Sequence, residues 1–238
     1  MDGLQYIGPE KNSLLPEFVR HLDRVLLISK KEPSADRFIQ TVSTALSTAD
    51  EHVLTMVLRH VLSRSYCLDK TVRHRACQVI AGIIGSLDAE HELDEALYTE
   101  LIDIMLPRLN DRVAMIRQEA VATLGRLQDV SNAADPITAT LLELMDSDSA
   151  AEVRKASLQN VVVNKVTLGH ILERVADVNP SVRAAALEAL AQKVDHRYLS
   201  MQQRLMCLER GLKDREAVVV EATQTMVRVY VCVCGCFE

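Results

Sequence analysis

One pattern recurs five times along the chain and constrains its fold more than any other feature. Each copy starts with an aspartate, followed by an aliphatic-arginine pair, an alanine and the hydrophobic face of a helix. The copies begin at Asp69, Asp111, Asp148, Asp177 and Asp214, and the last is decayed. Aligning Arg73, Arg117, Arg154, Arg183 and Val220 gives steps of 44, 37, 29 and 37 residues. Recurrence at roughly 30 to 47 residues predicts an all-α, HEAT/armadillo-like helical-hairpin solenoid.

Hydrophobic residues at helical spacing extend this pattern over most of the chain. They predict about six helix pairs, at residues 14–48, 52–87, 93–127, 136–163, 167–194 and 201–230. Residues 1–13 are predicted as a poorly ordered lead-in and 14–230 as the solenoid. Residues 231–238 are predicted as a cysteine-rich tail outside the repeats.

Several local signals predict helix boundaries. Asp135-Pro136 and Asn179-Pro180 each place a capping side chain before a proline at the first helical position. Ser149 with Glu152, and Ser200 with Gln203, match the capping box. Gly211 is predicted just past a helix end, and Pro107 is predicted to stop or kink its helix.

Composition agrees with close-packed helices and excludes some classes. Aromatic residues make up 3% of the chain and there is no tryptophan, so small and aliphatic side chains must fill the core. The formal charge of −6 argues against a generally basic nucleic-acid-binding chain, although a local patch remains possible. No apolar run approaches the roughly 20 residues that span a bilayer, and no secretory signal is visible. The chain is therefore expected in the cytosol or nucleus.

The six cysteines form two groups. Cys67, Cys77 and Cys207 occur singly in or beside helical patterns and are interpreted as reduced thiols. Cys232, Cys234 and Cys236 alternate near the end. No further ligand completes a tetrahedral set for them, so no metal site is predicted.

The recurring arginine allows two interpretations. In the structural one, each arginine pairs with the aspartate of its own or a neighbouring copy. In the functional one, the row of arginines meets phosphate. Because the aspartates recur together with the arginines, the structural interpretation is preferred. Phosphate contact would instead require bases outside the repeated pattern, and Lys70, Arg75, Arg112 and Lys155 are such bases.

Motifs for catalysis are missing. The chain has no GxSxG, no phosphate-binding glycine loop and no HExxH. We therefore predict neither an enzyme nor a cofactor.

Several segments resemble one known family. They are KTVRHRACQVIAGIIGSL at 70–87, MLPRLNDRVAMIRQEAVATLGRLQD at 105–129, DSDSAAEVRKASL at 146–158 and SVRAAALEALAQKVDHRYLSMQQRLMCLERGLKDR at 181–215. They are similar to condensin subunit 3, the chromosome-associated G subunit, over about residues 16–230. The resemblance implies a non-catalytic subunit that binds the kleisin chain and double-stranded DNA, irrespective of base sequence, beside the SMC ATPase.

The family resemblance implies a role in mitotic chromosome condensation, in the nucleus and on mitotic chromosomes, with cytoplasmic location possible in interphase. Candidate residues for contact with DNA or kleisin are Lys70, Arg73, Arg75, Arg112, Arg117, Arg154 and Lys155. The alternative is a generic HEAT scaffold between proteins, without nucleic-acid binding.

Family members are several-fold longer, so we interpret the chain as a fragment or a truncated product. A solenoid cut between repeats exposes an apolar face. Val218, Val219, Met226 and Val229 are predicted to lie on that poorly covered last helix.

Overall fold

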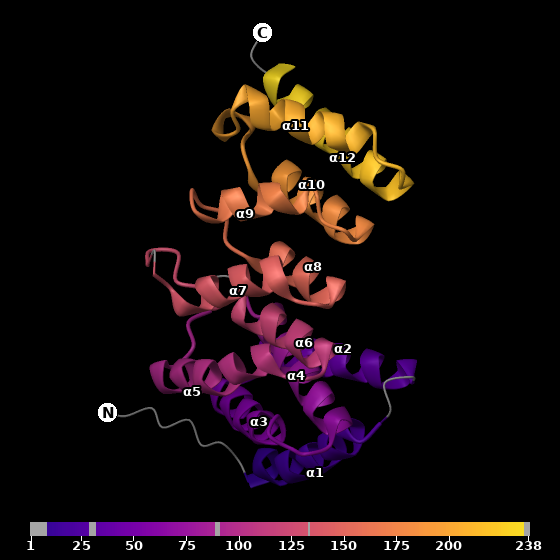
Figure 1. The fold of residues 1–238 in the computed structure, drawn as a ribbon. Coiled ribbons are helices and arrows are strands. Elements are labelled where there is room, and N and C mark those ends of the chain that lie inside the picture. Colours follow the sequence, from indigo (N-terminus) through magenta and orange to yellow (C-terminus); the bar gives the residue numbers. More distant parts are fainter. Residues whose placement is uncertain (1–8, 29–31, 89–90, 133, 236–238) are drawn as a thin grey trace, which may run out of the picture. The chain divides into compact units, whose positions relative to one another are not determined.

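The structure is a computed structural model that describes residues 9–28, 32–88, 91–132 and 134–235, with side chains excepted at 9–14 and 232–235. These residues form twelve α-helices and two 3-10 helices, and no strand (Figure 1). The helices are α1 (Pro9–Leu26), α2 (Pro33–Ser47), α3 (Glu51–Arg64), α4 (Lys70–Ser86), α5 (Glu95–Met105), η1 (Leu106–Asn110), α6 (Ala114–Leu124), α7 (Pro136–Ser147), α8 (Ala151–Asn160), α9 (Thr167–Arg174), α10 (Pro180–Lys193), η2 (His196–Tyr198), α11 (Met201–Leu212) and α12 (Ala217–Gly235). The predicted all-α class is confirmed.

The helices divide into two compact units, the first ending at Thr123 and the second beginning at Leu124. In the first unit α4 is central, because α1, α2 and α3 all pack against it. Ile80 and Ile83 of α4 have no exposed surface. Helix α2 therefore packs mainly on α4, whereas the sequence pattern grouped it with α1 as a first pair.

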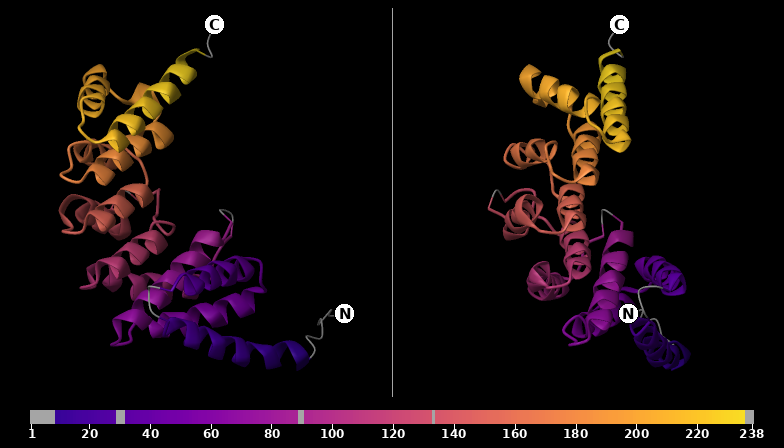
Figure 2. Two further views of the ribbon diagram at one scale, coloured as in Figure 1. Left: turned by 90° about the vertical axis from the view of Figure 1, so that its right-hand side faces the viewer. Right: turned by 45° about the vertical axis from the view of Figure 1, so that its right-hand side comes forward.

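The second unit is a regular stack of helix pairs. Helices α8, α10 and α12 follow one another in one layer, and α7, α9 and α11 each pack beside the second helix of their pair or of a neighbour (Figures 1 and 2). One continuous core joins these pairs, with Ile171, Leu187, Leu190 and Val219 almost fully buried. The central helix α10 buries alanines at 184, 185, 186, 189 and 191, which allow helices to approach closely.

Most predicted helix starts are confirmed. The Asp135 side chain accepts hydrogen bonds from the amides of residues 137 and 138, and the Asn179 side chain from the amide of residue 181. Ser200 and Gln203 form the predicted capping box. Helix α5 ends at Met105, and the following 3-10 turn carries Pro107, as a proline there requires.

Two local predictions are wrong. Helix α8 starts after Ala150, so Ser149 and Glu152 make no capping box. Instead the Asp148 carboxylate accepts the amide of Ala150 at 2.8 Å and forms the turn before the helix. Gly211 lies inside α11 rather than beyond it, because α12 crosses α11 at this point and leaves no room for a side chain.

The predicted exposure of the last helix is also wrong for two residues. Val219 and Met226 are each only 1% exposed, since this face of α12 packs against α10. Val218 on another face is 47% exposed. Helix α12 continues to Gly235, into the stretch predicted as a tail, while the cysteine side chains at 232, 234 and 236 lie outside the described part of the chain.

Two of the single cysteines are core residues. Cys77 and Cys207 are buried and unpaired with another cysteine, and burial raises the pKa of Cys77 to about 12 and that of Cys207 to about 11. Both thiols are therefore protonated near neutral pH, which agrees with the predicted reduced, packed state. None of the helices, as far as the chain is described, combines the length and hydropathy of a membrane span.

Candidate functional site

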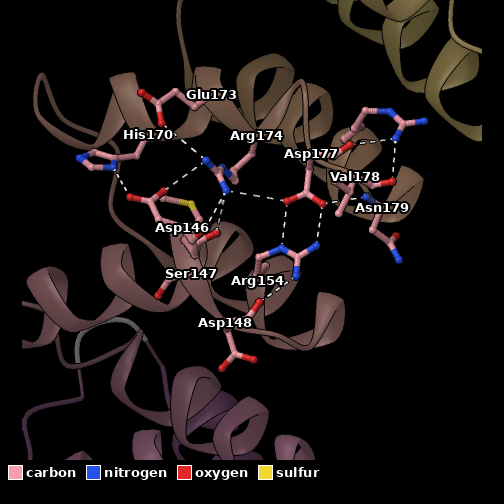
Figure 3. A network of polar contacts seen from close by, with 12 residues as sticks. Asp146, Ser147, Asp148, Arg154, His170, Glu173, Arg174, Asp177, Val178 and Asn179 are labelled. Atoms are coloured by element: carbon pink, nitrogen blue, oxygen red, sulfur yellow. Dashed lines mark hydrogen bonds and ion pairs between the residues drawn. The ribbon is translucent and has the colours of Figure 1, made fainter.

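The repeated arginine forms an ion pair with the aspartate of the following copy of the pattern. Arg154, near the start of α8, donates two hydrogen bonds to Asp177, with Nε–Oδ2 at 2.9 Å and Nη2–Oδ1 at 2.7 Å (Figure 3). Its third nitrogen, Nη1, donates to the backbone carbonyl of Asp148 at 2.8 Å. Arg154 thus closes the turn of its own copy and holds the turn of the next one.

The same arrangement occurs at two further copies. Arg183 donates to Asp214 at 2.7 and 2.9 Å and to the Asp177 carbonyl at 2.9 Å. Arg73 donates to Asp111 at 3.1 and 3.4 Å and to the carbonyl of Cys67 at 3.0 Å. We call these three pairs the Asp–Arg ladder: Arg73–Asp111, Arg154–Asp177 and Arg183–Asp214.

Each ladder aspartate also shapes the turn in which it lies. The amide two residues on donates to the carboxylate of Asp111, Asp177 and Asp214 at 2.8 to 3.0 Å. Burial would raise the pKa of Asp177, but hydrogen bonds from Arg154 and from the Asn179 amide outweigh burial and lower that pKa. A lowered folded-state pKa stabilises the fold above about pH 4, and this stabilisation is lost as the pH falls further.

A second arginine joins the ladder in two copies, three residues before the aspartate. Arg174 lies 3.9 Å from Asp177 and also 3.7 Å from Asp146, whose other oxygen is 2.7 Å from His170 Nδ1 (Figure 3). Arg108 similarly lies 3.5 Å from Asp111 and stacks over the ring of Tyr66. This pair was not predicted, although an arginine three residues before the aspartate is visible in the sequence of both copies.

The ladder confirms the structural interpretation of the repeated arginine at Arg73, Arg154 and Arg183. Their side chains are only 9% to 17% exposed, and all three nitrogens that can donate are used within the fold. Arg117 donates from Nη1 to the Asp111 carbonyl at 2.8 Å, again six residues back. We therefore assign these four residues to stability first.

Arg75 is placed by the structure in the interior of the first unit. It has no exposed surface, and it forms an ion pair with Asp36 and donates to Gln78 Oε1 at 2.7 Å. Gln78 in turn donates to Asp36 at 3.1 Å. A guanidinium without exposed surface cannot meet a phosphate, so we assign Arg75 to the packing of α2 on α4.

Glu119 of α6 borders this buried group and has an unusual protonation state. Burial and the negative charge of Asp36 raise the pKa of Glu119, Arg75 opposes both, and the net pKa is about 7. Its Oε1 lies 3.8 Å from Nε2 of His74, which is 6% exposed. The carboxyl therefore changes charge near neutral pH inside the first unit.

We expect the pKa of Glu119 to make folding pH-dependent. Because this pKa is raised from the ordinary 4.5 to about 7, the fold should lose stability as the pH rises through this range, by up to about 3 kcal/mol. Glu119→Gln should remove that loss and be more stable than the wild type at pH 8. Urea unfolding at pH 5 and pH 8 measures this, with Glu143→Gln on the exposed face of α7 as control. An identical pH dependence in wild type and Glu119→Gln would contradict the assignment.

Three of the predicted contact residues remain available at the surface. Lys70 and Arg112 are exposed, Lys155 is partly exposed, and none makes an ion pair within the described part of the chain. Lys70 and Arg112 directly follow the aspartates at 69 and 111. Since the ladder arginine neutralises Asp111, the charge of Arg112 is not compensated by that neighbour. These three residues are the part of the predicted site that the structure leaves free.

A second group of exposed bases lies in the second unit and was not predicted from the sequence. Arg210, Lys213 and Arg215 line an open cleft of about 490 Å³ beside the α11–α12 turn. The signal was present in the sequence, because Arg215 follows Asp214 as Lys70 follows Asp69. No cluster of histidine, cysteine or acidic side chains suited to a metal ion was found among the residues searched.

Comparison with known proteins first establishes the structural class. A designed armadillo repeat protein in complex with the peptide (KR)4 has a TM-score of 0.54 at 16% identity, covering 91% of this chain and 99% of that one. An archaeal HEAT-like repeat protein from Thermococcus onnurineus has a TM-score of 0.51 at 14% identity, covering 94% of each chain. The fold is thus that of HEAT and armadillo repeat proteins, as predicted.

No family model matches the chain, but it is similar to several curated proteins of one name. Condensin complex subunit 3 of Schizosaccharomyces pombe is 35% identical over 218 residues, which are 89% of this chain and 25% of the relative. The human protein of that name is 30% identical over 227 residues, 90% of this chain and 22% of the relative. The crystal structure of the S. pombe condensin Cnd3–Cnd2 subcomplex contains a chain with TM-score 0.80 and 34% identity, covering 90% of this chain and 28% of that one.

The chain is therefore similar to condensin subunit 3 over about nine-tenths of its own length, which confirms the predicted resemblance. It spans about a quarter of the length of the curated relatives it matches.

Proposed function

We propose that this chain is part of a non-catalytic HEAT-repeat subunit of condensin that binds the kleisin subunit and the backbone of double-stranded DNA. Through the kleisin it acts beside the SMC ATPase subunits in mitotic chromosome condensation. Its place of action is the nucleus and mitotic chromosomes, with the cytoplasm possible in interphase.

One observation carries the kleisin part of this proposal. The matching chain at 34% identity and TM-score 0.80 was solved in the Cnd3–Cnd2 subcomplex, that is, together with a second condensin component. A similar fold over 90% of this chain supports a similar partner surface. We take the kleisin to be that partner.

Charge supports the DNA part. The net charge of −6 excludes attraction by the chain as a whole, so contacts must be local. Lys70 and Arg112 are exposed and free of ion pairs among the described residues, whereas Arg73, Arg154 and Arg183 are used by the ladder. Long, exposed basic side chains suit phosphate oxygens, which carry no sequence information. Binding should therefore be independent of base sequence and sensitive to salt.

The alternative is a scaffold that binds proteins but not nucleic acid. Four of the seven predicted contact residues support it, because they stabilise the fold: Arg73 and Arg154 in the ladder, Arg117 through the Asp111 carbonyl, and Arg75 as a core residue. The ion pairs of Arg73, Arg75 and Arg154 within the fold do not require a nucleic acid.

A titration separates the two functions. The purified chain, alone and with a kleisin segment, is titrated into a labelled duplex of about 40 base pairs over a series of salt concentrations. We expect binding at about 50 mM salt that weakens steeply as salt rises. Kleisin binding without any duplex binding at low salt would favour the scaffold, and loss of both would contradict the condensin function.

A further inference from the structure

An open cleft in the second unit is lined by residues of two helices and of the turns beside them. Val175 and Ala176 follow α9, Arg183 belongs to α10, Arg210 belongs to α11, and residues 213–216 connect α11 to α12. The volume is about 490 Å³, and most of the polar lining is charged. Neither the predicted contact residues nor the relatives' names assign a role to this cleft.

The charges in the cleft do not cancel. Arg183 and Asp214 neutralise each other through two hydrogen bonds of 2.7 and 2.9 Å. Arg210, Lys213 and Arg215 are exposed and make no ion pair in the described part of the chain, while Glu216 is the remaining acid of the lining. Three positive charges against one negative charge make the cleft attractive to an anion.

The cleft repeats a feature of the first unit. Arg215 directly follows the ladder aspartate Asp214, just as Arg112 follows Asp111. In both copies the aspartate forms an ion pair with an arginine of the preceding copy. The aspartate therefore does not neutralise the base that follows it. The Asp–Arg ladder thus neutralises the aspartates at these turns, while the bases beside them keep their charge and remain exposed.

We propose that the cleft formed by Arg210, Lys213 and Arg215 binds phosphate groups of a double-stranded DNA backbone. This inference rests on the proposed function and adds a second contact surface to it. The geometry favours a duplex over a single small anion, because the three bases are exposed and the lining contains no buried, unpartnered polar group that would hold one phosphate rigidly. Such bases contribute through counterion release, one phosphate contact each.

The test compares two double charge reversals in the second unit. Lys213→Glu/Arg215→Glu changes the cleft, and Lys165→Glu/Arg228→Glu makes the same change of charge at exposed residues outside it. Both variants and the wild type, each with the kleisin segment, are titrated into the same duplex across the salt series. Thermal unfolding checks that the exposed substitutions leave the fold intact.

We expect the cleft variant to lose at least about tenfold in affinity at low salt and to reduce the slope of log K against log salt by about two. The control variant should lose much less and keep the slope. Equal losses of affinity in both variants, or no loss in either while the wild type still binds, would contradict phosphate binding at the cleft. Neither result would contradict the proposed function. Absence of wild-type binding would overturn both.

Discussion

Arg154→Ala is expected to lower the free energy of unfolding by about 3 kcal/mol. Arg154 is 9% exposed and Asp177 is 3% exposed, so the substitution leaves a nearly buried carboxylate without its main partner. It also removes the hydrogen bond that closes the turn at Asp148. Urea unfolding measured at pH 7 provides this number.

A matched control separates buried from exposed pairs. Arg197 makes equally short contacts to Asp195, at 2.7 Å, but is 74% exposed. Solvent screens such a pair, so Arg197→Ala should barely move the unfolding midpoint. If Arg154→Ala were as mild as Arg197→Ala, the ladder would not be a stabilising element.

Gly211→Ala is expected to destabilise the second unit by about 2 kcal/mol. A Cβ at this position of α11 would overlap Oγ1 and Cγ2 of Thr223 on α12. Thr223 cannot turn away freely, because it is fully buried and its hydroxyl donates to the Val219 carbonyl at 2.7 Å. The substitution therefore forces the two helices apart.

The same exchange elsewhere should have the opposite sign. Nothing lies within 4 Å of a Cβ built on Gly169 of α9, so Gly169→Ala should raise stability by up to about 1 kcal/mol through helix propensity. Thr223→Ala should partly restore the Gly211→Ala variant by making room. A destabilised Gly169→Ala, or no rescue by Thr223→Ala, would show that crowding is not the cause.

Periodicity predicted the helices well because each pair buries an apolar stripe that is local in sequence. The predicted capping at Asp135, Asn179 and Ser200 also depends on neighbours within three residues. Gly211 was misplaced because its role comes from a helix crossing, which no local pattern reveals. Val219 and Met226 were misplaced for the same reason, since α10 covers them.

The site was predictable only in part. Recurrence of aspartates with arginines correctly indicated ion pairs between copies, and Arg154–Asp177 is one. Burial of an individual base was not visible: Arg75 looked like a free charge because its partner Asp36 lies 39 residues earlier in the chain. The cleft bases were not predicted because the copy that starts at Asp214 is decayed and has Val220 at the position of the repeated arginine.

The most direct test of the account is the salt dependence of duplex binding by Lys70→Glu/Arg112→Glu with the kleisin segment. These bases are exposed and outside the ladder, so the variant should unfold at the wild-type temperature. We predict an affinity loss at low salt and a salt slope reduced by about two. A wild-type slope with a lowered unfolding temperature would contradict the account, because it would place these two bases in the fold and not at the DNA.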